Sequence, residues 1–153
     1  MNRPSALVAP LLVGLMLIAG NSLAAAPDSV TVSDAWARAT PAHAHMGSIY
    51  LRILSATGDR LLQASVPHSV SGDTQLHETT VQHDSSGGGD TMKMRQVSSI
   101  ALPAGEVVEL KPGGFHVMLV ELKHGLKAGD KLSLTLRFER AGTRKVTADV
   151  RGL

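Results

Sequence analysis

Residues 92–118 read MKMRQVSSIALPAGEVVELKPGGFHVM, and the interpretation of the whole chain starts from this stretch. It opens with Met92 and Met94, which flank a lysine, and closes with His116 and Met118, which flank a valine. In a β-strand, residues i and i+2 point to the same side, so each of these two pairs shares one face. Thioether and imidazole groups are donors that favour Cu(I) over harder ions. The stretch therefore predicts a copper site, with the rest of the chain as its scaffold.

The sequence around this stretch alternates short apolar runs with Gly- and Pro-rich turns, and it shows no convincing amphipathic helix. Residues 131–138, KLSLTLRF, place Leu132, Leu134 and Leu136 on one face and polar residues on the other. Many short alternating runs with frequent turns indicate an all-β sandwich or barrel. About nine strands are expected, at residues 30–36, 48–54, 60–66, 74–81, 92–97, 107–110, 115–122, 131–138 and 144–150, with loops at 40–47 and 69–73.

The composition bounds the size and chemistry of the protein. A chain of 153 residues is enough for one domain and too short for two good cores. It contains no cysteine, which excludes thiolate ligands, a blue-copper electron-transfer site and CxxC redox chemistry. With one Trp, one Tyr and two Phe, the core must be largely aliphatic. No basic run is interleaved with aromatic residues, so binding of nucleic acid is not expected.

Residues 1–24 have the features of a secretory signal peptide. Arg3 precedes an almost entirely apolar run at residues 6–19, and Ser22-Leu23-Ala24 offers small residues where a signal peptidase reads the chain. The apolar run is short for a membrane-spanning helix, although an uncleaved anchor is the alternative. We expect cleavage after Ala24, a mature domain at residues 25–153, and a periplasmic location.

His77 completes the predicted metal-binding set. It lies in the expected strand 74–81, on the side that also carries Gln75 and Thr79. Taken singly, a strand methionine is usually a core residue and a lone histidine is usually packed or exposed. Together with the methionine pair and the HxM step, however, His77 gives a set of two imidazoles and two thioethers. Such neutral donors favour Cu(I), whereas zinc prefers more imidazole, carboxylate or thiolate.

The sequence resembles the PCu(A)C family of periplasmic copper chaperones. That family has a histidine, a methionine about a dozen residues later, then twenty-one residues and an HxM step. In this chain, residues 95–115 are the twenty-one residues between Met94 and His116. The resemblance covers roughly residues 33–150. The other matching motifs are AWARATP at 35–41, Gly47, Tyr50, LHE at 76–78, MKMR at 92–95, LPAG at 102–105, ELKPGG at 109–114, and GD at 129–130 before the run LSLTLRFE.

This resemblance implies a cupredoxin-like Greek-key β-barrel and a Cu(I) site made by His77, Met94, His116 and Met118. It also implies a carrier that hands copper to an acceptor protein, such as a subunit of cytochrome c oxidase on the way to its copper-A centre, or to another copper chaperone. One spacing departs from the family. Sixteen residues separate His77 from Met94, about five more than usual, and the Gly-rich hairpin at 82–91 absorbs the surplus at little cost. Met92 therefore stays an alternative to Met94.

Further donors lie outside this set. His43, His45 and Met46 form an HxHM cluster in the loop at 40–47, and the inserted hairpin adds His83. Loops that contain histidine can bind Cu(II). A second, weaker Cu(II) site is thus an open alternative to a simple exposed polar loop.

The sequence favours a binding protein over an enzyme. A thiol–disulfide reductase would need cysteine, and a copper oxidase would need a His-rich Cu(II) centre. Two alternatives to the carrier remain: a copper storage or resistance protein that binds both Cu(I) and Cu(II), and a structural β domain whose methionines are core residues. Contact with a membrane is expected only through the acceptor.

Overall fold

The computed structural model describes residues 29–152, and over that range the chain forms ten β-strands and no helix. The predicted signal peptide and its cleavage site lie outside these residues. Within them, no helical segment long and apolar enough to cross a membrane occurs. The strands are β1 (Val30–Arg38), β2 (Met46–Ser55), β3 (Asp59–Ser65), β4 (Ser71–Gln82), β5 (Thr91–Gln96), β6 (Ile100–Leu102), β7 (Val107–Leu110), β8 (Phe115–Leu122), β9 (Lys131–Phe138) and β10 (Thr143–Arg151).

The nine expected strands are all present, and three details differ from the sequence-based expectation. The expected loop at 40–47 is wrong at its end, because β2 already begins at Met46. Residues 100–102 form an additional short strand, β6, which pairs with β3. The expected loop at 69–73 is wrong in part, because β4 already begins at Ser71. Ser71 pairs with Leu122 of β8, and its buried hydroxyl donates to the carbonyl oxygen of Val120 at 2.5 Å. A long-range strand partner, which local composition does not reveal, extends this strand.

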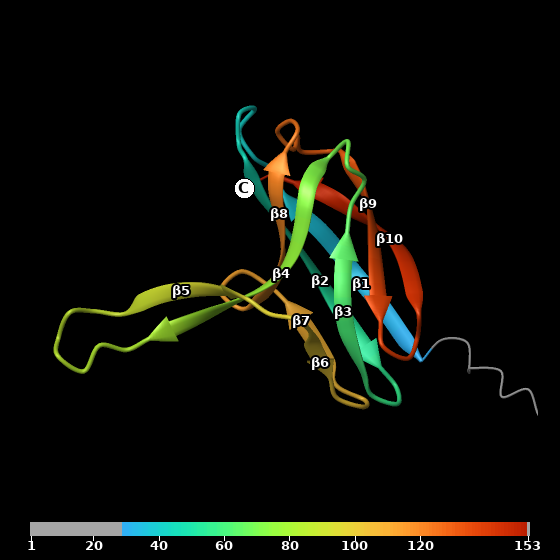
Figure 1. Ribbon diagram of the computed structural model, residues 1–153, viewed down its shortest axis with the longest axis horizontal. Helices are drawn as coiled ribbons and strands as arrows, with labels where there is room; N and C mark the ends of the chain where they lie inside the picture. The colour runs from blue at the N-terminus through green and yellow to red at the C-terminus, as the bar shows by residue number, and fades with distance from the viewer. Residues whose placement is uncertain (1–28, 153) are drawn as a thin grey trace, which may run out of the picture.

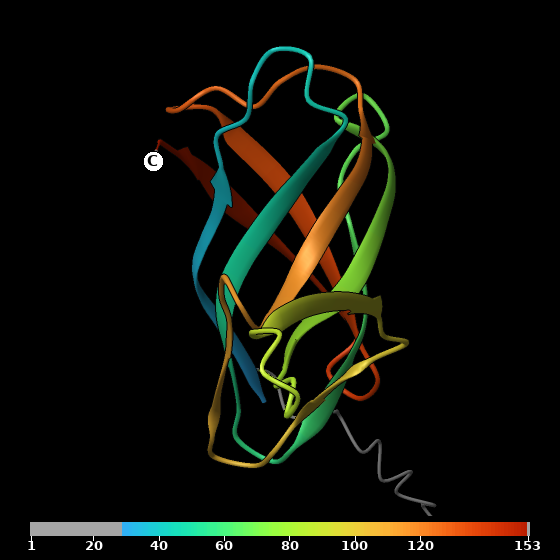
Figure 2. The ribbon, with the colours of Figure 1, turned by 90° about the vertical axis from the view of Figure 1, so that its left-hand side faces the viewer.

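The strands form one sheet that curls into an open barrel (Figures 1 and 2). Its order is β5-β4-β8-β2-β1-β10-β9-β3-β6, and β7 pairs with β2 outside this path. The β1–β10 pair is parallel, and the other strand pairs are antiparallel. The strand order does not close on itself, because no hydrogen-bonded pair joins its β5-β4 end to its β3-β6 end. The barrel therefore has an open seam between β3 and β4.

The interior of the barrel is aliphatic, as expected. Strand β9 alternates buried and exposed residues along most of its length, which is the pattern of a strand with one face in a core. Burial of each large aliphatic side chain stabilises the fold by about 1.5–3 kcal/mol. The inward-facing residues of the two strands nearest the predicted site are Ile49, Leu51 and Ile53 of β2, and Val117 and Leu119 of β8, each at most 1% exposed.

A β-bulge in β1 changes which side of the strand faces the core. Val30 and Val32 pair with inward-facing positions of β2, and the register then shifts between Ser33 and Trp36. Asp34 in this bulge has a positive φ of 48°. The extra residue reverses the alternation, so Ala37 is fully buried and Trp36 lies on the outer face.

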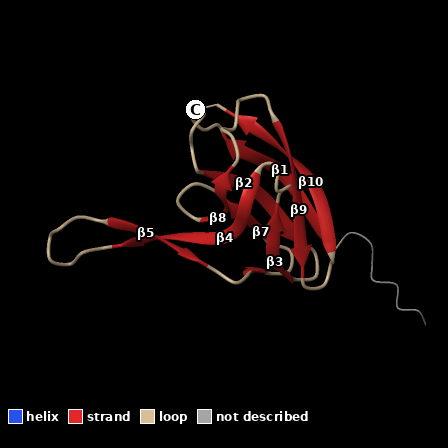
Figure 3. Cartoon of the chain, turned by 45° about the horizontal axis from the view of Figure 1, so that its top comes forward, coloured by secondary structure: helices blue, strands red, loops and turns tan. Residues whose placement is uncertain are grey.

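One hairpin extends away from the barrel. The end of β4 and the whole of β5 project from the body as an arm, which we define as residues 79–95 (Figures 1 and 3). All six residues of β5 are exposed. Methionine residues on this strand therefore do not belong to the core.

Candidate metal centre

His77 and His116 lie directly opposite each other on β4 and β8. Residues paired in this way in an antiparallel sheet point to the same face, and the two ring centroids are 5.7 Å apart. This face is the outer one, because the neighbouring residues Leu76 and Val117 point into the core. The pairing joins two strands that are far apart in the sequence and brings two imidazoles to one point at the base of the arm.

Each imidazole has one nitrogen engaged and one nitrogen free. Nδ1 of His116 lies 3.1 Å from the carbonyl oxygen of Gly114. Because a carbonyl oxygen only accepts, Nδ1 carries the ring proton and donates it in this hydrogen bond. Nε2 of His77 lies 2.8 Å from Oε1 of Gln75. The remaining nitrogens, Nε2 of His116 and Nδ1 of His77, are buried and have no hydrogen-bond partner. A buried polar atom without a partner is costly, and a metal ion would use both lone pairs.

Gln75 is itself held in place. Its side-chain Nε2 donates to Oδ2 of Asp73 at 2.8 Å, which leaves Oε1 to accept the proton of His77. A ligating histidine typically donates its other N–H to such an outer partner, which fixes its tautomer and ring orientation. The chain Asp73–Gln75–His77 has this arrangement, so the geometry fits a metal ligand.

The pKa of His77 is lowered from its ordinary value. Partial burial disfavours the charged ring, and the nearby His116 adds to the effect. The imidazole is therefore neutral at neutral pH, which is the form that a metal ion binds.

Met118 and Met94 lie on the same face as the histidines. Met118 is two residues from His116 along β8, and Met94 pairs with Thr79, which is two residues from His77 along β4. Met118 lies opposite Gln75 and is 9% exposed. Met94 lies opposite Thr79 on the arm and is 62% exposed. The structure thus brings His77, His116 and Met118 together beside the barrel, and it places Met94 adjacent to them on the arm. Met92 lies one pair further out, opposite Val81, and is 71% exposed.

Charged ligands are not part of this arrangement. Glu78 accepts hydrogen bonds from Arg95 at 2.6 and 2.9 Å, and Asp90 lies 2.7 Å from His83 at the end of the arm. Over residues 29–152, no three or more His, Cys, Asp or Glu side chains are grouped so that they could hold a metal ion. A centre at the histidine pair would therefore depend on thioether donors.

Two aromatic rings, those of Tyr50 and Trp36, lie in a row beside His116. The Trp36 and Tyr50 rings are 4.7 Å apart between centroids, and Tyr50 is 6.4 Å from the ring of His116. On the far side, Cζ of Arg151 lies 5.6 Å from the centre of the Trp36 ring. Neither aromatic residue was predicted to have a role in the site, and both belong to the motifs that carry the family resemblance. The sequence did offer one signal that could have pointed to them, since they are the only Trp and the only Tyr in the chain.

The other candidate ligands do not pair with either histidine. His43 and His45 are exposed in the loop between β1 and β2, and Met46 is the first residue of β2. His83 is exposed at the end of the arm. The HxHM cluster and His83 thus lie in different parts of the fold, at the β1–β2 connection and at the end of the arm, and His83 is hydrogen-bonded to Asp90, not to the paired histidines.

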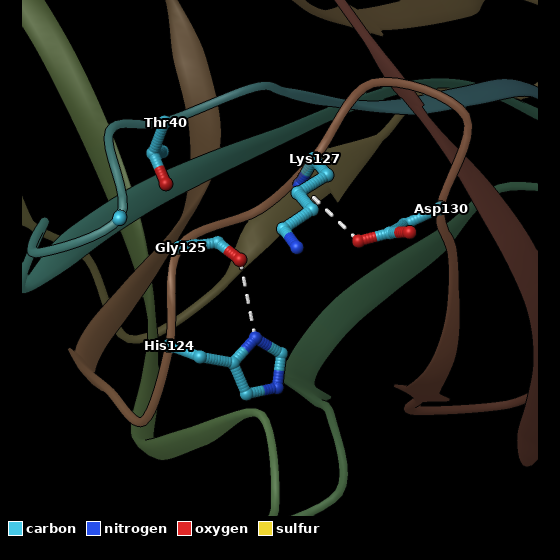
Figure 4. A pocket seen from close by; sticks show the side chains of 6 residues that line it. Thr40, His124, Gly125, Lys127 and Asp130 are labelled. Carbon is cyan, nitrogen blue, oxygen red and sulfur yellow. Dashed lines mark hydrogen bonds between the residues drawn. The ribbon is translucent and has the colours of Figure 1, made fainter.

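One hollow in the described surface is lined by none of the residues of this centre. It has a volume of about 620 Å³ and lies between the β1–β2 and β8–β9 loops, where Thr40, Lys127 and Asp130 surround it (Figure 4). His124 also faces it, and Nδ1 of this residue donates to the carbonyl oxygen of Gly125 at 3.1 Å. Its lining contains no thioether, so the histidine pair, with its two nitrogens that lack a hydrogen-bond partner, is the stronger candidate for a metal centre.

Comparison with known proteins gives a family and a fold. The family model described as "LpqE-like: Putative lipoprotein LpqE-like" matches residues 30–150. The protein named "Putative lipoprotein Lxx21020" from Leifsonia xyli subsp. xyli is 35% identical over 124 residues, which cover 81% of this chain and 70% of that protein.

Solved structures of PCuAC domains have the same fold. The apo PCuAC domain from PmoF1 is 25% identical, with a TM-score of 0.66, and the match covers 82% of this chain and 95% of that one. The Cu(I) form of DR1885 from Deinococcus radiodurans is 27% identical, with a TM-score of 0.61, and the match covers 87% and 85%. The copper-bound PCuAC domain from PmoF2, at 23% identity and a TM-score of 0.63, agrees in fold. The expected cupredoxin-like β fold is confirmed, and the chain belongs to the LpqE-like family with the fold of the PCuAC domains.

Proposed function

We propose that this protein is a Cu(I) carrier of the cell envelope. The observation that carries the proposal is the pair of opposed imidazoles, each with one buried nitrogen that has no hydrogen-bond partner. Thioethers on the same face supply the soft donors that select Cu(I). The likeness to DR1885, whose structure is described as a Cu(I) form, supports the same cargo.

The proposed ligands are His77, His116, Met118 and Met94. The first three lie against the barrel, whereas Met94 is exposed on the arm. An acceptor could therefore approach the ion from the side of Met94 and add its own ligand before the buried ligands dissociate. Because all four donors are neutral, the bound ion keeps a single positive charge.

The location and the recipient are part of the proposal. The two lipoprotein descriptions and the signal-peptide pattern of residues 1–24 support export to the periplasm, with residues 25–153 as the carrier domain. The recipient we propose is a copper-accepting protein, either a cytochrome c oxidase subunit during formation of its copper-A centre or another copper chaperone.

A competition titration with a chromophoric Cu(I) chelator under anaerobic conditions tests the cargo and the ligands. We expect one tightly bound Cu(I) per chain. His116→Gln and Met118→Leu should each raise the Kd by at least the roughly 10- to 100-fold that the loss of an outer-shell partner causes. His68→Gln, at an exposed histidine in the loop between β3 and β4 that is not a proposed ligand, is the matched control. If the double variant H116Q/M118L bound Cu(I) as tightly as the parent, the proposed function would be wrong.

A further inference from the structure

All four methionines of residues 29–152 lie on one face of the sheet. Met46 pairs with Val120, and the next outward pair in β2 and β8 is Ser48 with Met118. Two residues further along β8, His116 pairs with His77. The next outward pairs, in β4 and β5, are Thr79 with Met94 and Val81 with Met92. The order along this face, which we call the donor ladder, is Met46, Met118, the pair His116 and His77, Met94, and Met92.

Five successive steps of the sheet thus each carry a sulfur or nitrogen donor. Positions two residues apart in a strand are separated by about 6.4–6.8 Å. Methionine has three rotatable side-chain bonds and no branch, so thioethers on adjacent steps can turn towards a common ion. The ladder is continuous, because each step is joined to the next along a single strand.

The two ends of the ladder are exposed, whereas at its centre Met118 and His116 are buried and His77 is partly buried. The exposed fractions are 59% for Met46, 9% for Met118, 3% for His116, 62% for Met94 and 71% for Met92. A fully apolar role would place methionine in the core, yet three of the four lie on the surface. Their position on the metal-binding face is what they share.

We propose that Met46 and Met92 are transfer ligands, which bind Cu(I) transiently as it enters or leaves the buried centre. This inference rests on the proposed function and adds two residues to the four ligands of the resting site. At the arm end, a bond between Cu(I) and Sδ of Met92 forms while Met94 still holds the ion, and a bond to a buried imidazole then breaks. Met46 and Met118 act in the same way at the other end. Copper remains Cu(I) throughout, and no proton or electron moves.

The test separates the affinity for Cu(I) from the rate of its transfer. Bicinchoninate, a bidentate Cu(I) chelator, serves as the acceptor, and the parent is compared with the double variant M46L/M92L. Leucine keeps the size of the side chain and removes the sulfur. Val81→Ala is the matched control, because Val81 is exposed on the same face of the arm and has no donor atom.

We expect the Kd of M46L/M92L to stay close to the parental value, while the rate of Cu(I) transfer to bicinchoninate falls by about tenfold or more. With ¹³C-labelled methionine methyl groups, Cu(I) below one equivalent should broaden the signals of Met46 and Met92 in the parent. A transfer rate equal to that of the parent would overturn the inference. So would a loss of affinity as large as that of M118L, because it would make these residues resting ligands. A parent that fails to bind Cu(I) would instead refute the proposed function itself.

Discussion

At the scale of single residues, the free nitrogens of His77 and His116 are the basis of the proposed chemistry. Hydrogen bonds to Oε1 of Gln75 and to the carbonyl oxygen of Gly114 select which nitrogen remains free on each ring. The free nitrogen is Nδ1 in His77 and Nε2 in His116. The two histidines are therefore not equivalent ligands.

Gln75→Leu tests the role of the outer partner of His77. The change removes the acceptor for Nε2 and leaves the ring free to rotate or change tautomer. We expect the Kd for Cu(I) to rise by roughly 10- to 100-fold, as for other outer-shell partners of metal ligands. Gln63→Leu is the control, since Gln63 accepts a hydrogen bond from Arg137 on β9, away from the centre. Equal affinities for the two variants, measured by chelator competition, would contradict this role.

At the scale of elements, we expect copper to affect the arm more than any other part of the fold. Its outer strand β5 is entirely exposed and is held to β4 by the pairs from His77–Gln96 to Gln82–Thr91. Elements with few buried apolar contacts open at low free-energy cost. A bond from the ion to Met94 would tie the arm to the barrel through the histidine pair.

Hydrogen–deuterium exchange measures this effect. In the apo protein, the amides of β5 should exchange much faster than those of β2 and β8. Cu(I) should slow exchange in β5 in the parent and leave it nearly unchanged in Met94→Leu. If Met94→Leu showed the same protection and Met92→Leu did not, Met92 would be the fourth ligand, the alternative that the spacing left open.

The elements also show what the sequence could and could not predict. The alternation of runs such as residues 131–138 predicted the strands correctly, and the spacing of the HxM step predicted two adjacent donors on one face. The direct pairing of His77 with His116 depends on the register of β4 against β8, which joins residues 39 positions apart. The Gly-rich hairpin at 82–91 was expected, but the projection of β5 away from the barrel was not, because Met92 and Met94 alternate as core residues would. The additional strand β6 has only three residues and no pattern of its own.

At the scale of the whole molecule, the barrel is held together by side chains remote from the metal centre. Asp59, at the start of β3, accepts backbone N–H bonds from Arg60 at 2.7 Å, Arg140 at 2.9 Å and Ala141 at 2.8 Å. It thereby ties β3 to the turn between β9 and β10. Partial burial acts to raise the pKa of this carboxyl, but the three backbone bonds and the charge of Arg140 prevail, and its pKa lies below the ordinary 3.8.

This pKa gives a prediction for acid stability. A carboxyl whose pKa is lowered by folding stabilises the native state fully above the unfolded-state pKa, and this contribution is lost as the pH falls through the folded-state pKa. Asp59→Asn should therefore be less stable than the parent at pH 7, by about 1 kcal/mol. The difference should shrink as the pH falls below 3.8, the ordinary value. Urea denaturation of the apo protein from neutral to acidic pH measures it, and a difference independent of pH would contradict the assignment.

The bulge at Asp34 limits how the length of this protein can vary. The loop at the end of the arm can gain residues freely, because residues 83–90 lie beyond the last β4–β5 pair, Gln82 with Thr91, and added residues would not change the register of that pairing. The segment from Val30 to Trp36 has no such freedom. If the strand paired without this bulge, the indole of Trp36 would turn inwards and Ala37 outwards, and every later side chain of β1 would change sides with them. Among relatives that keep an aromatic residue beside Tyr50, insertions and deletions should therefore accumulate in the hairpin, and the only length change in the first strand should be the loss of the bulge residue itself.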